Sequence, residues 1–122
     1  MRATRRLALR GALVCAALVL ALPAAHAHSE LRASQPAAGA RLAAAPATIE
    51  LHFNEPVQLT VLSLVDAAGR RTRVALPADT TPRATERLPA PPLAPGAWRI
   101  EWRAISADGH PVRGTVRFTI ER

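Results

Sequence analysis

The stretch GAWRIEWRAISADGHPVRGTVRFTI, residues 96–120, decides the fold class. Apolar residues alternate with polar or charged ones on both sides of a central Asp-Gly turn signal. An alternation of period two places the apolar side chains on one face of a strand. The pattern therefore predicts two strands joined by a polar turn, each burying one face. The apolar positions are Trp98, Ile100, Trp102, Ala104, Val116, Phe118 and Ile120.

The same period recurs toward the amino terminus. Ile49, Leu51 and Phe53 alternate with polar residues, and TVLSLVDAAGRRTRVAL, residues 60–76, reads as two strands joined by a turn at 66–69. Proline and glycine, including a proline at 56, separate these runs, while residues 72–95 fit either a long loop or a short edge strand. Short strands with frequent turn signals predict an all-β protein, most simply a β-sandwich.

The first 27 residues differ from the remainder of the chain. Four arginines lie among the first ten residues, positions 11–22 are almost wholly apolar, and Ala25-His26-Ala27 supplies the small residues of a cleavage site. This is the pattern of a secretory signal peptide, with an apolar run too short for a comfortable membrane span. A retained anchor or a buried helix is the alternative. Arg5-Arg6 resembles a twin-arginine signal, which leaves Sec and Tat export both open.

Cleavage after position 27 would divide the chain into a signal peptide, residues 1–27, and one domain, residues 28–122. Removing the four leader arginines lowers the formal net charge from +7 to +3. A mild excess of arginine without lysine is a weak nucleic-acid signal, so we expect no nucleic-acid partner. The single cysteine, Cys15, and the single methionine, Met1, leave with the leader, which excludes disulfide, thiolate and thioether chemistry from the domain.

Histidine supplies the candidate chemistry of the domain, because neither a hydrolase spacing nor a phosphate-binding glycine loop occurs. Cleavage after Ala27 would make His28 the amino-terminal residue. Its α-amine and ring nitrogen could then chelate one metal ion, and two such nitrogens suit Cu(II). A loose terminal histidine is the simpler alternative. Cleavage after Ala25 would instead expose a His-Ala-His chelator, but Pro23 disfavours that cut.

SADGHPVRG, residues 106–114, adds two further donors. Asp108 and His110 are two residues apart, and Gly109 between them lets the backbone bend and bring carboxylate and imidazole together. With residue 28 they would complete a set of three nitrogens and one oxygen, although a plain polar turn would carry the same signal. His52 reads as a solvated strand histidine, and Glu55 as a weak ligand or an acceptor near the site.

The order of these motifs resembles the CopC family of periplasmic copper-binding proteins over nearly all of residues 28–122. The resemblance begins in AHAHSEL (25–31) and SQPAAGARL (34–42), which is similar to an S-x-P-x-x-G motif. It continues in IELHFNEPV (49–57), which is similar to a strand of the family that ends in F-S-E. It closes in residues 95–120, which contain the S-x-D-x-H-P-x-x-G turn.

The resemblance implies a Greek-key β-sandwich or barrel, immunoglobulin-like or cupredoxin-like. It also implies one Cu(II) site per chain made by the amine and ring of His28 with Asp108 and His110. Glu55 lies near that site in some members. A second, Cu(I) site of the family uses a methionine-rich loop, and residues 70–92 contain no methionine. We therefore expect no Cu(I) site, and His52, which accompanies those methionines elsewhere, to be a surface residue.

These points predict a monomeric periplasmic Cu(II)-binding protein, not an enzyme, for copper resistance or homeostasis. The resemblance implies an inner-membrane copper transporter of the CopD type as a partner. Two other functions remain open. One is a copper-dependent oxidative enzyme of the histidine-brace type known from lytic polysaccharide monooxygenases, although that brace lacks an equatorial carboxylate. The other is a metal-free interaction domain.

Overall fold

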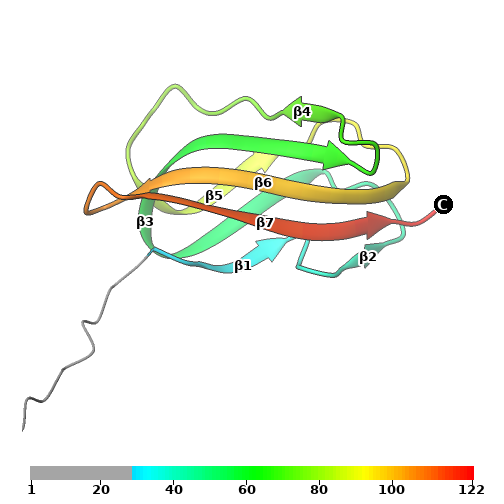
Figure 1. Cartoon of the computed structure of the whole chain (residues 1–122), viewed down its shortest axis with the longest axis horizontal. Coiled ribbons are helices and arrows are strands. Elements are labelled where there is room, and N and C mark those ends of the chain that lie inside the picture. Colours follow the sequence, from blue (N-terminus) through cyan, green and yellow to red (C-terminus); the bar gives the residue numbers. More distant parts are fainter. Residues whose placement is uncertain (1–28) are drawn as a thin grey trace, which may run out of the picture.

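One long strand, β3 (Thr48–Asp66), organises the molecule (Figure 1). The computed structural model describes residues 29–122, so the predicted signal peptide and His28 lie outside the described residues. The other strands are β1 (Leu31–Gln35), β2 (Arg41–Leu42), β4 (Arg71–Arg73), β5 (Arg83–Pro89), β6 (Gly96–Ser106) and β7 (Pro111–Ile120). In the described part of the chain, no helix is long and apolar enough to cross a membrane.

β3 belongs to two layers because its two halves have different partners. Residues 48–53 pair with β1 on one side and β5 on the other, both antiparallel. Residues 57–66 pair with β6, and the end of the strand also pairs with β4. β7 continues this second layer beyond β6, and β2 joins its edge in parallel. The predicted all-β sandwich is confirmed as a curled sheet that folds over one core.

Pro56 does not separate two strands, contrary to the sequence-based expectation. β3 continues through it, although Pro56 has no N–H to donate to a neighbouring strand. The pairing changes at this point. The β3–β5 register shifts between His52 and Val57, and the β3–β6 pairing begins only at Val57. Proline is tolerated at such an irregularity, where β3 passes from one layer to the other.

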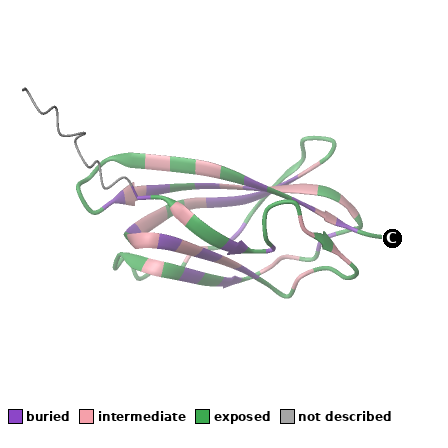
Figure 2. Ribbon diagram, turned by 90° about the horizontal axis from the view of Figure 1, so that it is seen from below, coloured by how far each residue is buried: buried purple, intermediate pink, exposed green. Residues whose placement is uncertain are grey.

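The apolar residues of β3, β6 and β7 pack into the core, as the alternation predicts. Buried and exposed residues alternate along the ribbons (Figure 2). Phe53 of the first layer meets Trp102 of the second edge to face, with ring centroids 5.0 Å apart. Trp98 is only partly buried and donates its indole N–H to the carbonyl of Ala94, at 2.8 Å. The buried apolar residues include Ile49, Leu51, Leu62, Leu64, Ile100, Ala104, Val116, Phe118 and Ile120.

β5 occupies part of the stretch that the sequence left between loop and edge strand. Its inward positions include Leu88 and also Glu86, a carboxyl that is only 8% exposed. Two flanking prolines and this inward acid obscure the apolar alternation that would have identified the strand. Burial raises the pKa of Glu86, and the charge of Arg83 opposes that rise.

Glu86→Gln should stabilise the protein at neutral pH. A folded-state pKa above the unfolded value favours folding at low pH, and this contribution is lost as the pH rises through the folded pKa. The variant should therefore melt at a higher temperature than wild type at pH 7, with the difference shrinking toward pH 4. Thermal unfolding followed by circular dichroism measures it. Glu121→Gln, at an exposed ion pair with Arg41, is the control and should change little. An equal gain in both variants would contradict the assignment to burial.

Gly114→Ala should destabilise the fold. A Cβ at residue 114 would lie 2.6 Å from Cζ2 and 2.8 Å from Nε1 of Trp102, and this ring is held in the core. Forcing an extra methyl into a packed site costs about 1–3 kcal/mol. Urea unfolding should show a loss of this size, whereas Thr115→Ala, at an exposed position one residue on, should show much less. A Gly114→Ala protein as stable as wild type would refute this close contact.

Candidate metal centre

The turn between β6 and β7 is a three-residue hairpin loop, residues 107–109. Ser106 N donates to the carbonyl of His110 at 2.9 Å, and Gly109 N donates to the carbonyl of Ser106 at 2.9 Å. Gly109 has φ +86°, a left-handed conformation that glycine adopts without strain. Such a loop is a common way to close a hairpin of this length. It confirms the predicted Asp-Gly turn between two strands.

The turn between β3 and β4 repeats this geometry without metal-binding side chains. Asp66 N donates to the carbonyl of Arg70 and Gly69 N to the carbonyl of Asp66, both at 3.0 Å. Gly69 has φ +84°. Asp66, at the first position, accepts hydrogen bonds from the N–H groups of Ala68 and Arg70. The chemistry of the β6–β7 turn therefore comes from its side chains and not from its backbone.

Asp108 and His110 are brought together by their turn. Oδ2 of Asp108 lies 2.7 Å from Nδ1 of His110, and both side chains are more than half exposed. An ionised carboxylate can only accept a hydrogen bond, so Nδ1 carries the proton in this contact. In the neutral ring, Nε2 is then the nitrogen with a lone pair for a metal. The predicted proximity of carboxylate and imidazole is thus confirmed.

Ser106 positions Asp108, and its role was not assigned from the sequence. Its buried hydroxyl donates to Oδ1 of Asp108, while the backbone N–H of His110 lies 3.2 Å from the serine Oγ. The Ser106 hydroxyl, followed by His110, holds the pKa of the Asp108 carboxyl well below its usual range. Asp108 is therefore anionic throughout the physiological pH range. The serine two residues before the aspartate was the available signal.

The chain next to His28 is anchored to the same end of the sandwich. Ser29, only 4% exposed, donates its hydroxyl to Oε1 of Glu55 at 2.5 Å. The backbones of Glu30 and Asn54 are also joined, since Asn54 N donates to the carbonyl of Glu30 at 3.0 Å. Figure 1 shows the start of β1 and the β6–β7 turn at one end of the molecule.

The strand register agrees with this placement. Val57 pairs with Ser106 in the antiparallel β3–β6 ladder, so Glu55 and Asp108 lie two residues beyond the same paired position. The Glu55 carboxylate nevertheless accepts the hydrogen bond of Ser29 and does not join Asp108 and His110 in a cluster of metal ligands. Within residues 29–122, no group of three or more His, Cys, Asp or Glu side chains is close enough to hold a metal ion. His28, the third predicted ligand, lies outside the described residues.

His52 belongs to another surface. Its Nε2 lies 3.6 Å from Oε1 of Glu50, and its Nδ1 lies 3.4 Å from the hydroxyl of Thr85 on β5. The side chain is 39% exposed. This is the solvated strand position that the alternation predicts.

Comparison with known proteins identifies the family. A family model described as CopC domain matches residues 31–121. Copper resistance protein C of Pseudomonas syringae pv. tomato is 34% identical over 115 residues, which cover 87% of this chain and 90% of that protein. The chain therefore belongs to the CopC family.

Solved structures agree with this assignment. The crystal structure of CopC from Methylosinus trichosporium OB3b has a TM-score of 0.66 at 32% identity, covering 77% of this chain and 94% of that one. The structure of PcoC, a methionine-rich copper resistance protein from Escherichia coli, has a TM-score of 0.54 at 34% identity. That match covers 78% of this chain and all of the PcoC chain.

Proposed function

We propose that this protein binds one Cu(II) ion per chain in the periplasm and serves copper resistance or homeostasis. The observation that carries the proposal is the exposed Asp108–His110 pair, held ready beside the end of the sandwich where Ser29 is anchored. The names of its relatives, copper resistance proteins, support copper as the metal. We further propose that it acts as a binding protein and not as an enzyme.

The proposed ligands are the α-amine and ring of His28, the imidazole of His110 and the carboxylate of Asp108. Nitrogen and carboxylate donors without sulfur suit Cu(II) better than Cu(I). Oδ1 of Asp108 accepts from the Ser106 hydroxyl and from the backbone N–H of His110. Oδ2 faces Nδ1 of His110 and keeps a second lone pair for a metal. The ionised state of Asp108 means that this ligand releases no proton when it binds.

Ser29 and Glu55 are proposed to act indirectly. Their hydrogen bond fixes the residue to which His28 is attached, which lowers the conformational entropy lost when the terminal ligand binds. Glu55 then supports the site as an acceptor for Ser29. Residues 70–92 contain no methionine, and we propose that a thioether Cu(I) site is absent from this chain. Delivery to a CopD-type membrane transporter and a monomeric state complete the proposal.

The free amine at His28 is the sharpest test. Intact-mass analysis of the exported protein should give a chain that begins at His28. Titration with Cu(II) against a competing chelator should give one ion per chain. One extra glycine before His28 should weaken binding by about 100-fold or more, because loss of a direct ligand should exceed the 10–100-fold cost of losing a supporting partner.

Histidine variants provide the matched control for this experiment. His110→Ala should lose affinity as severely as the extended chain, whereas His52→Ala should bind like wild type. Equal affinity of the native and extended amino termini would refute the proposed ligand set. Binding that depends on His52 and not on His110 would place copper elsewhere.

The β3–β4 and β6–β7 turns have the same geometry, so matched glycine variants in them can distinguish an effect on stability from an effect on metal binding. Gly109→Ala and Gly69→Ala each put a Cβ at a φ near +85°, at a cost of about 1–2 kcal/mol. Both variants should lose similar stability in urea unfolding. Only Gly109→Ala should also weaken Cu(II) binding, by roughly tenfold, because it displaces Asp108 relative to His110. Equal copper affinity in both variants would contradict positioning by the β6–β7 turn.

A further inference from the structure

The outer face of the second layer holds a groove that the copper site does not use. It has a volume of about 570 Å³ and lies across β3, β4, β6 and β7. This size falls within the range of small-molecule pockets, roughly 300–1,000 Å³. Among its lining residues are four arginines and one acid. They are Arg71, Arg73, Arg103, Arg113 and Glu101.

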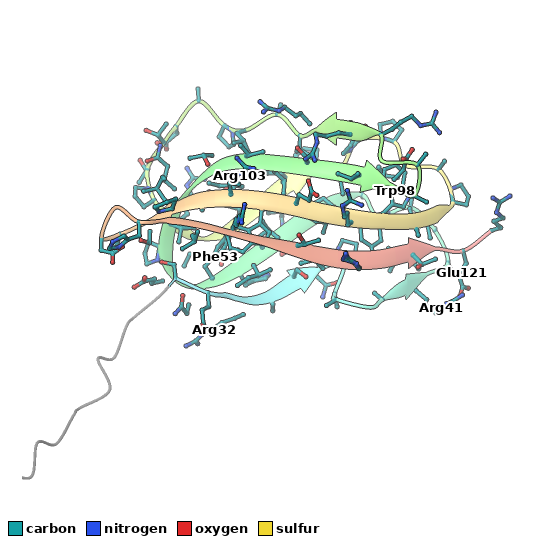
Figure 3. All side chains as sticks on the ribbon, in the orientation of Figure 1. Arg32, Arg41, Phe53, Trp98, Arg103 and Glu121 are labelled. Carbon is teal, nitrogen blue, oxygen red and sulfur yellow. The ribbon has the colours of Figure 1, made fainter. Side chains whose placement is uncertain are left out.

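The strand register concentrates like charges in this groove. Arg103 of β6 lies directly opposite Arg113 of β7, and four residues away Arg99 lies opposite Arg117. Like charges directly opposite each other in a sheet are destabilising. Blue guanidinium nitrogens lie over the β6 and β7 ribbons in Figure 3, where Arg103 is labelled. The fold thus keeps an unfavourable charge arrangement that a bound anion would relieve.

Glu101 neutralises only part of this charge. Its carboxylate forms ion pairs with Arg71 at 2.5 Å and with Arg99 at 3.0 Å. Within residues 29–122, no carboxylate lies within ion-pair distance of Arg73, Arg103 or Arg113. Three guanidinium groups of the groove are therefore available to an external anion.

The floor of the groove also holds a buried polar side chain without a partner, Ser63. In the described part of the chain, the only buried side-chain polar atoms that lack a hydrogen-bond partner are Oγ of Ser63 and Nε1 of Trp102. Ser63 lines the groove and is 0% exposed, whereas the Trp102 ring lies in the core against Phe53. Ser63 sits in one cross-strand row between Arg73 and Glu101. A buried polar group without a hydrogen-bond partner lowers the stability of the fold. The presence of such a group at Ser63 therefore points to a ligand that supplies the missing partner.

The unpaired groups define the chemistry of that ligand. A guanidinium can only donate hydrogen bonds, and a serine hydroxyl can donate as well. A metal cation would find only Glu101 as a strong acceptor, and that carboxylate is already doubly paired. An anion with several acceptor oxygens fits the three unpaired guanidinium groups and the Ser63 hydroxyl. Arginine is the side chain best suited to carboxylate and phosphate geometry.

We propose that this groove binds a small multivalent oxyanion, carrying two or more phosphate or carboxylate groups. Arg73, Arg103 and Arg113 supply the charge, and the Ser63 hydroxyl supplies a donor from the floor. One monovalent ion would leave most of the groove and most of its charge unused. The site is separate from the Asp108–His110 pair, since neither residue lines it.

Isothermal titration of the metal-free, processed protein with pyrophosphate and with citrate tests this proposal. One site per chain is expected for at least one of them, and the preferred probe distinguishes phosphate from carboxylate as the source. Arg103→Gln/Arg113→Gln should weaken binding by about tenfold or more, from the loss of charge-assisted hydrogen bonds. Acetate at equal ionic strength should not bind measurably.

Arg41→Gln/Arg87→Gln is the matched control, because it removes the same net charge from two other surfaces. It should leave anion binding unchanged. Ser63→Ala should weaken binding several-fold while the protein stays at least as stable, because the variant removes an unsatisfied buried hydroxyl. All of these variants should bind Cu(II) like wild type, so a failure of this proposal is distinguishable from a failure of the copper site.

Three results would overturn the proposal. They are no saturable binding of either probe, equal weakening by both double variants, and unchanged affinity in Ser63→Ala. Binding confined to vesicles of anionic phospholipid, with none to pyrophosphate or citrate, would also overturn it and would assign the arginine face to a membrane surface.

Discussion

The contact between Phe53 and Trp102 joins the two layers of the molecule, and the rest of the structure depends on it. Phe53 comes from the half of β3 that pairs with β1 and β5, whereas Trp102 comes from β6. The indole then lies so close to Gly114 that β7 has no room for a side chain there. One aromatic pair thereby ties the first half of β3 to the β6–β7 hairpin.

The register of that hairpin has consequences at both of its surfaces. At its end, it sets the loop that brings Asp108 and His110 together over a buried serine. On its outer face, it aligns arginine opposite arginine twice. A slip of one residue would turn every side chain of β7 to the other face, so the metal pair and the arginine groove share one constraint.

The β3–β4 and β6–β7 loops show that the candidate metal site depends on side chains and not on backbone geometry. Both have three residues, the same hydrogen-bond pattern and a glycine with φ near +85°. In one, Asp66 satisfies the N–H groups of its own loop. In the β6–β7 loop, Ser106 occupies the first position, and the aspartate of this loop, Asp108, comes two residues later and contacts the imidazole of His110. The same backbone geometry therefore presents an exposed carboxylate in this loop.

Local sequence determined the β class, both hairpin turns and the adjacency of Asp108 and His110, because period-two alternation and Asp-Gly or Ala-Gly turns act within a few residues. The same local signals were wrong about Pro56 and undecided about β5. Pro56 is tolerated inside a strand because the pairing partner of β3 changes there. Glu86 points inward and so breaks the apolar alternation of β5. Both effects depend on strands that are distant in sequence. Only the tertiary structure decided that Ser29 is fixed by Glu55, that Trp102 excludes a side chain from Gly114, and that arginines of three strands line one groove around Ser63. Those contacts join residues on different segments of the chain, such as Ser29 with Glu55 and Trp102 with Gly114. Side-chain patterns within one strand carry no record of which strand lies beside it.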